Sequence, residues 1–219
     1  MAPRCLLYYI TDRRQFSGDE GSQRKNLFSK VAEAARAGVD YIQLREKDLS
    51  TRALEHLARK IVDIVHETSD LTRVLINSRT DVALAAGSDG VHLRSEDVTA
   101  QEVKAIWRES GTNMAASDAP PIIAVSCHSP EDAARVASEG AHFAVLAPIF
   151  GKTKAPGVQC LGLDGVRNAT QLKIPVIALG GITLRNAESC LDAGAAGIAG
   201  IRLFQQNNIE DVVRTLRRL

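Results

Sequence analysis

The sequence lacks the features of membrane, secreted and nucleic-acid-binding proteins. No apolar run approaches the roughly 20 residues that a membrane-spanning helix requires. The N-terminal segment is apolar over too short a stretch for a secretion signal. The 219 residues contain 27 Lys and Arg against 26 Asp and Glu, and a net charge of +1 does not favour a polyanionic partner. We therefore expect neither a membrane nor a nucleic acid among its partners.

Cysteine is scarce and scattered along the chain. The four cysteines have neither the paired spacing of a zinc site nor the density of a disulfide scaffold. They are Cys5, Cys127, Cys160 and Cys190. This usage is typical of a cytoplasmic protein with reduced thiols.

One pattern recurs along the chain. AARAGVDYIQLRE (34–46), ALAAGSDGVHLRS (83–95) and CLDAGAAGIAGIR (190–202) share it, and AARVASEGAHFAVLAP (133–148) is a looser copy. In each, an Ala-rich segment reaches a glycine, which is a signal for a helix C-terminus, and a strand-like run follows. The repeat indicates alternating strands and helices around a parallel sheet.

Eight strand-like runs alternate with helical segments. The expected strands are 6–11, 41–46, 73–78, 90–94, 122–127, 143–149, 175–180 and 197–201. The expected helices are 22–37, 50–68, 79–87, 99–109, 129–139, 162–170, 183–193 and 208–218. This arrangement predicts an α/β fold, a single compact TIM (β/α)8 barrel over residues 1–219. The alternative is an open doubly wound sheet, but the first strand lacks the glycine-rich turn of that fold.

Polar residues alternate with aliphatic ones in four of the expected strands. If the aliphatic side chains face the helices, the polar ones face the lumen near its C-terminal mouth, where barrel active sites lie. The lumen residues would be Gln43, Arg45, Lys47, Asn77, His92, Arg94, Ser126 and His128. Each also has an ordinary explanation, such as a solvated strand end or a core histidine. Their shared location favours a site.

Two further features point to phosphate chemistry. Gly180 and Gly181 close the seventh expected strand, and Gly197 and Gly200 flank the eighth, where barrels commonly bind phosphate through backbone N–H groups. The segment 147–162 resembles a loop over the mouth, and it carries Lys152, Thr153 and Lys154. It could equally be a solvated loop. With Arg45 and Lys47, its lysines would give four cations, which suits a polyanion such as a pyrophosphate.

The chain resembles the thiamin-phosphate synthase and TenI superfamily along nearly its whole length. The resemblance is carried by LYYITD (7–12), QLREKD (43–48), INSRTDVALAAGSDGVHL (76–93), SED (95–97), VSCHS (125–129), the PIFGKTK loop and ALGGIT (178–183). Synthases of this family join a thiazole phosphate to a hydroxymethylpyrimidine pyrophosphate. The resemblance implies these phosphorylated substrates for this chain.

The resemblance also implies roles for single residues. Ser126, His128 and Lys154 match catalytic positions, with Ser126 near the departing group. The pyrophosphate would bind Arg45, Lys47, Asn77 and Lys154, with Thr153 beside them, and the pyrimidine would bind Gln43. The thiazole phosphate would lie against the Gly181 loop and the backbone of Gly200 and Ile201.

Magnesium is implied in the same way, with a difference. Synthases typically hold Mg²⁺ with two carboxylates. Asp97 matches one of them, but Ser78 stands where the other is expected. Arg94 could supply part of the missing charge, which predicts weak Mg²⁺ dependence.

Two other functions stay open. A TenI-like thiazole tautomerase moves a proton without metal or pyrophosphate, and His128 matches its histidine. A catalytically inactive relative that binds thiazole phosphate is the second. Retention of Arg45, Lys47 and Lys154 favours the synthase. Small barrels often pair, which leaves a homodimer open.

Overall fold

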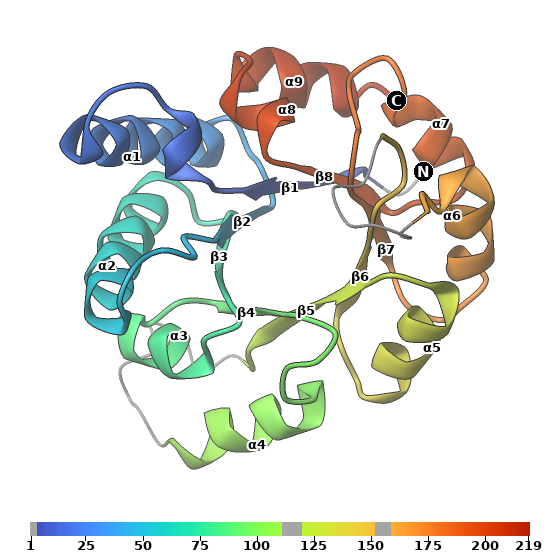
Figure 1. Ribbon diagram of the computed structural model, residues 1–219, viewed down its shortest axis with the longest axis horizontal. Coiled ribbons are helices and arrows are strands. Elements are labelled where there is room, and N and C mark those ends of the chain that lie inside the picture. The colour runs from blue at the N-terminus through green and yellow to red at the C-terminus, as the bar shows by residue number, and fades with distance from the viewer. Residues whose placement is uncertain (1–3, 111–119, 152–158) are drawn as a thin grey trace.

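Eight strands form a closed parallel barrel. The computed structural model describes residues 4–110, 120–151 and 159–219. The strands are β1 (Leu6–Ile10), β2 (Tyr41–Leu44), β3 (Arg73–Asn77), β4 (Gly90–Leu93), β5 (Ile122–Cys127), β6 (Phe143–Leu146), β7 (Val176–Ala178) and β8 (Gly197–Gly200). Each strand pairs with its neighbours in chain order, and β1 pairs with β8 to close the ring (Figure 1). The predicted TIM barrel is confirmed, and the open sheet is excluded.

Helices surround the barrel (Figure 1). They are α1 (Glu20–Arg36), α2 (Thr51–Thr68), α3 (Thr80–Ala86), α4 (Ala100–Glu109), α5 (Pro130–Ser138), α6 (Gly162–Thr170), α7 (Ala187–Asp192), α8 (Arg202–Gln205) and α9 (Ile209–Leu216), with a 3-10 turn η1 (Arg13–Gln15) after β1. Within the described ranges, none of these helices has both the length and the apolar character to cross a membrane.

Local sequence sets several of the helix ends. Thr99 and Glu102 form a reciprocal capping box at the start of α4, and the Ser129 side chain caps α5. At the other end, α3 stops at Gly87, which has the left-handed φ of 66° that glycine adopts without strain. The glycines of the repeated pattern therefore end helices, as expected.

Alternation along the strands separates two apolar layers. The outer layer packs under the helices and includes Ile42, Leu44, Val91 and Val125. The lumen holds a smaller apolar cluster, made of Tyr8, Ile10, Leu75, Ala124, Phe143, Val145, Ile177 and Ala199. The side chains at the C-terminal ends of the strands lie above this cluster, so the lumen is a packed floor beneath a polar mouth.

Several elements differ from the prediction at their ends. β2 stops at Leu44 because the next amide, that of Arg45, donates to the Thr11 hydroxyl rather than to a neighbouring strand. The predicted helix 183–193 begins only at Ala187. α8 was not expected, since four residues carry no helical period.

Candidate active site

The charged run that follows β2 divides into two pairs. Arg45 and Lys47 line a cavity at the mouth of the barrel. Among the described residues neither has an ion-pair partner. The nearby Arg45 charge, together with partial burial, lowers the pKa of Lys47. Two cations held close together without a counter-ion form a site for an anion.

Glu46 and Asp48 point the other way and support those cations. The buried Glu46 carboxylate accepts from the Thr11 hydroxyl (2.7 Å) and from the Arg13 backbone and guanidinium (3.0–3.1 Å). The Asp48 carboxylate accepts two hydrogen bonds of 2.7 Å from the same guanidinium. Because the Thr11 oxygen also accepts from the Arg45 amide at 3.0 Å, this network fixes the backbone that carries the cations.

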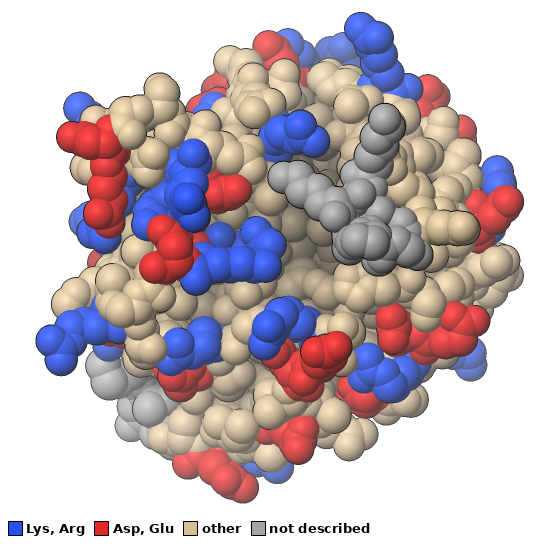
Figure 2. Space-filling view, in the orientation of Figure 1, with Lys and Arg blue, Asp and Glu red and all other residues tan. Residues whose placement is uncertain are grey.

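The cavity that Arg45 and Lys47 line is called the lumen cavity. It has a volume of about 420 Å³. Its lining comes from the C-terminal ends of all eight strands or from the residues that follow them: Ile10, Gln43, Arg45, Lys47, Asn77, His92, Arg94, Ser95, Glu96, Ser126, His128, Ala147, Leu179 and Ile201. All eight residues expected to face the lumen are among them. Figure 2 shows Lys and Arg side chains beside the central hollow.

Two amides lie side by side in this cavity. The Gln43 side chain donates to the Asn77 oxygen at 2.7 Å, and Asn77 donates in turn to the Ser78 hydroxyl at 3.2 Å. The Gln43 oxygen is buried and has no hydrogen-bond partner among the described residues. A buried acceptor left unpaired is costly, so this oxygen is available to accept a hydrogen bond from a bound molecule.

A row of three hydrogen-bonded side chains crosses the lumen. The Tyr8 hydroxyl lies 2.7 Å from Nδ1 of His92, and Nε2 of His92 lies 2.8 Å from the Ser126 hydroxyl. Burial and the nearby Arg45 charge lower the pKa of His92 to about 3, so the imidazole is neutral. His92 and Ser126 both border the lumen cavity, and Ser126 forms the end of the row.

His128 lies at the rim of the same cavity. Its Nδ1 is 2.9 Å from the Ala147 carbonyl, an acceptor, so Nδ1 carries the proton. In the neutral ring Nε2 then has a free lone pair, which is the form of a general base.

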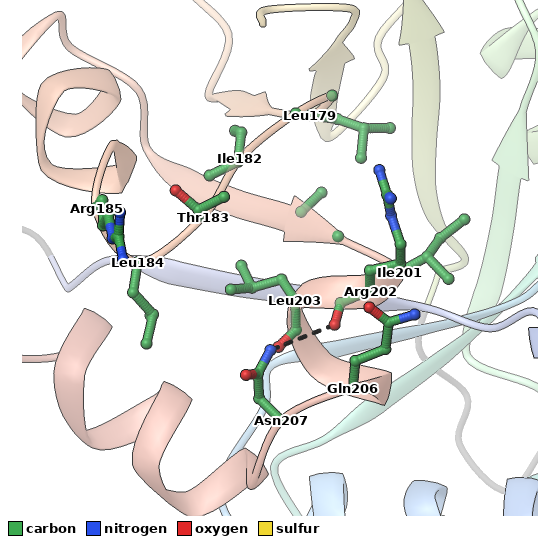
Figure 3. Close-up of a pocket in the computed structure, with 14 residues that line it drawn as sticks. Leu179, Ile182, Thr183, Leu184, Arg185, Ile201, Arg202, Leu203, Gln206 and Asn207 are labelled. Atoms are coloured by element: carbon green, nitrogen blue, oxygen red, sulfur yellow. Dashed lines mark hydrogen bonds between the residues drawn. The ribbon is translucent and has the colours of Figure 1, made fainter. Parts of the chain in front are cut away.

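A second space, the glycine cavity, lies where the strand ends of β7 and β8 meet α8. It has a volume of about 580 Å³ and is lined by both glycine loops, including Gly180, Gly181 and Gly200. Gly181 adopts φ 66°, and a Cβ there would lie 2.5 Å from the Phe150 carbonyl oxygen, so only glycine fits. Figure 3 shows the Arg202 side chain extending toward Leu179 across this cavity.

The two cavities share a wall. Leu179 and Ile201 border both of them. Arg45, Lys47 and the Gln43 and Asn77 amides therefore lie on one side of this apolar partition, and glycine backbone together with Arg202 lies on the other. This arrangement can hold two anionic ligands with their uncharged parts in contact.

The proposed metal position is occupied by an ion pair. Asp97 accepts from the Arg94 guanidinium (2.7 and 3.0 Å) and from the Arg94 backbone amide (2.8 Å). Desolvation acts to raise the pKa of Asp97, but hydrogen bonds from Arg94 and Ser78, together with the Arg94 charge, outweigh it and lower the pKa. In the described part of the chain no three His, Cys, Asp or Glu side chains are grouped as metal ligands. The residues present do not fit a preformed Mg²⁺ site.

Most of the expected site residues border one or both cavities. Gln43, Arg45, Lys47, Asn77, Ser126 and His128 border the lumen cavity, Gly181 and Gly200 border the glycine cavity, and Ile201 borders both. Asp97 lies beside Arg94 and lines neither cavity. Thr153 and Lys154, together with Lys152, lie outside the described residues.

Sequence reasoning missed two supporting groups. Tyr8 lies in an apolar run and gave no polar signal, although it contacts His92 across 84 positions of sequence. Arg13 belonged to a mixed-charge tract, and nothing in that tract indicated that one arginine is buried against Glu46.

Comparison with known proteins gives a consistent result. The family model described as thiamine monophosphate synthase matches residues 7–204. The chain is 37% identical to a putative thiamine-phosphate synthase 2 of Aquifex aeolicus, over 90% of this chain and 96% of the relative. It is 34% identical to a thiamine-phosphate synthase of Coprothermobacter proteolyticus, over 99% of this chain and 95% of the relative.

A solved structure is similar along the same length. The thiamine phosphate pyrophosphorylase from Pyrococcus furiosus superposes with a TM-score of 0.77 at 29% sequence identity, covering 97% of this chain and 94% of that one.

Proposed function

The chain belongs to the thiamine monophosphate synthase family, and we propose that it joins a thiazole phosphate to a hydroxymethylpyrimidine pyrophosphate, giving thiamin monophosphate and pyrophosphate. One observation carries the proposal: two cavities, each with an anion-binding side, adjoin at Leu179 and Ile201. A reaction between two phosphorylated substrates requires such a pair.

The pyrophosphate end belongs to the lumen cavity. Arg45 and Lys47 supply unpaired positive charge, and Asn77 supplies an amide beside them. Charge-assisted hydrogen bonds to phosphate are the stronger kind, and the Arg fork can make two at once. Thr153 and Lys154 are proposed to join them from the segment outside the described residues.

The pyrimidine belongs deeper in the same cavity. The unpaired Gln43 oxygen is proposed to accept from an N–H group on the ring. This contact would orient the ring so that its methylene carbon faces the partition.

The thiazole phosphate belongs to the glycine cavity. Backbone N–H groups of the Gly181 loop and of Gly200 and Ile201 are proposed to hold it, beside the short helix α8. The Asn186 side chain fixes that loop, since it accepts from the Thr183 amide at 2.8 Å and donates to the Gly181 carbonyl at 3.1 Å. Loops after the seventh and eighth strands with a short extra helix are a common phosphate site in barrels.

Bond formation would then take place at the partition. The methylene–oxygen bond breaks, pyrophosphate leaves with the electron pair, and the thiazole nitrogen donates its lone pair to the pyrimidine methylene. Arg45 and Lys47 stabilise the charge that accumulates on the departing oxygen. Leu179 and Ile201 keep water from the reactive carbon between the two steps.

No step of this scheme is assigned to magnesium. Mg²⁺ prefers oxygen ligands, and both Asp97 oxygens are held by Arg94. We propose that the Arg94 guanidinium supplies part of the charge that a metal would bring, and that Mg²⁺ dependence is weak.

A second candidate function rests on His128. Its free Nε2 beside the lumen cavity suits proton transfer on a thiazole carboxylate phosphate, the tautomerase reaction. A non-catalytic relative would bind the phosphate ester without turnover.

One experiment separates the three. Purified protein is incubated with both synthase substrates, with and without Mg²⁺, and then with the thiazole tautomer alone. The synthase releases pyrophosphate and forms thiamin phosphate, the tautomerase acts only on the tautomer, and the inactive relative does neither. Millimolar Mg²⁺ as a strict requirement would refute the metal argument.

A matched pair of variants tests the cation site. Arg45→Gln should raise KM for the pyrophosphate substrate by about 10- to 100-fold, since a hydrogen bond to a charged group contributes about 1.5–3 kcal/mol. Arg59→Gln removes an exposed arginine of α2 that pairs with Glu55, and it should leave KM unchanged.

A further inference from the structure

The hydrogen bonds that join Tyr8, His92 and Ser126 can be assigned a donor and an acceptor. Tyr8 and His92 are buried, and the Tyr8 hydroxyl lies 2.7 Å from Nδ1 of His92. Ser126 lies 2.8 Å beyond, at the lining of the lumen cavity. Each of the two hydrogen bonds can run either way, and the choice decides what Ser126 offers to a ligand.

The tyrosine settles the choice. In the described part of the chain the Tyr8 hydroxyl has one hydrogen-bond partner, Nδ1 of His92. A buried hydroxyl that donated nowhere would leave its proton unsatisfied. Tyr8 therefore donates, and Nδ1 is the unprotonated nitrogen.

The neutral ring transmits that direction. Because burial keeps His92 uncharged, its single ring proton must then be on Nε2. Nε2 donates to the Ser126 oxygen, and the Ser126 proton is left free to point into the cavity. In the opposite arrangement Ser126 would donate to the ring and present only lone pairs, which repel a phosphate.

We propose that Tyr8 and His92 are positioning residues that fix Ser126 as a hydrogen-bond donor toward the departing phosphate oxygen. No proton is transferred: the hydrogen bond from Ser126 strengthens as charge builds on that oxygen. The identity of the acceptor rests on the proposed function, whereas the direction of the row does not.

Nitrogen-15 NMR of the histidines tests the direction without turnover. The chain has five histidines, and the His92 signals are those lost in a His92→Gln variant. We expect a protonated Nε2 and an unprotonated Nδ1 in the wild-type protein, and a mixture of tautomers in Tyr8→Phe. Tyr41→Phe is the matched control, because Tyr41 packs edge-on against Tyr8 but lies outside the row. A wild-type protein with its proton on Nδ1 overturns the proposal.

Binding of inorganic pyrophosphate tests the consequence. By calorimetry, Ser126→Ala should weaken binding about 10-fold and Tyr8→Phe about 5-fold, the scale of one charge-assisted hydrogen bond. In a Ser126→Ala background Tyr8→Phe should have no further effect, and Tyr41→Phe should have none in either background. An equal loss from Tyr8→Phe with and without the serine would show a general packing effect and overturn the proposal.

Kinetic measurements distinguish failure of the proposed synthase function from failure of the proposed role of Tyr8. If the synthase reaction occurs, Tyr8→Phe should lower kcat about 10-fold more than it raises KM for the thiazole phosphate. If the protein does not catalyse it, the proposed function fails, while the NMR and pyrophosphate results still decide whether Tyr8 directs Ser126.

Discussion

The buried carboxylate beneath the cationic site allows a sharp stability prediction. Glu46 is 5% exposed and accepts hydrogen bonds from the Thr11 hydroxyl and from Arg13. The change Glu46→Ala removes all of these acceptors at once. It leaves the Arg13 guanidinium, itself almost fully buried, with Asp48 as its remaining ion-pair partner.

The size of the effect follows from this burial. The Thr11 hydroxyl and the Arg13 backbone amide lose their acceptor, and each buried donor left unsatisfied costs about 1–3 kcal/mol, so we expect a total loss of about 3–5 kcal/mol. For a chain of this size each kcal/mol lowers Tm by about 2–4 °C, so we expect a loss of roughly 6–20 °C. The exposed pair Arg24–Glu20 on α1 is the contrast, with side-chain exposures of 40% and 62%. Glu20→Ala should cost about 0.3–0.5 kcal/mol.

Urea unfolding at 25 °C and a thermal scan of both variants provide the measurement. Glu46→Gln is a useful intermediate, because it keeps the shape and one acceptor but removes the charge. The same samples should show a raised KM for the pyrophosphate substrate in Glu46→Ala, since Thr11 no longer holds the Arg45 amide in place. If Glu46→Ala costs no more than Glu20→Ala, the network does not support the site and the reasoning fails.

Three further predictions concern other parts of the molecule. Gly90→Ala should lose about 1–3 kcal/mol or more in urea unfolding, because the new Cβ would lie 1.9 Å from the Ile122 carbonyl oxygen. The hydrogen bond to Asp89 raises the pKa of His66, so protonated His66 stabilises the fold at acidic pH, and that contribution is lost as pH rises through the folded-state pKa. His66→Gln should therefore lower stability by up to about 1 kcal/mol at pH 5.5 and change little at pH 8.5. Ser78→Asp should raise synthase turnover in the presence of Mg²⁺, and φ 58° at this position suits aspartate; an unchanged or lower rate would count against a missing metal ligand.

The sequence predicted the barrel and the direction of its side chains because both depend on local alternation. In β2, Ile42 and Leu44 face the helices and Gln43 faces the lumen, as the two-residue period requires. The same rule placed Asn77 and Ser126. A closed ring then gathers these residues, and no knowledge of distant contacts is needed.

The remainder depends on partners that are far apart in the chain. Arg45 and Lys47 reach the cavity while Glu46 is buried, but the burial of Glu46 depends on Arg13, 33 residues away. The end of β2 likewise depends on the Thr11 side chain. Such pairings depend on tertiary packing, so the pattern of residues along the sequence does not predict them.

The partition formed by Leu179 and Ile201 also affects product release. If the two cavities bind the substrates as proposed, a molecule made from both occupants would extend past Leu179 and Ile201 and be bound on each side. Because binding at the second cavity would be intramolecular, the affinity for the joined compound would exceed the affinity for either half. We then expect product release, rather than bond formation, to be the rate-limiting step of turnover.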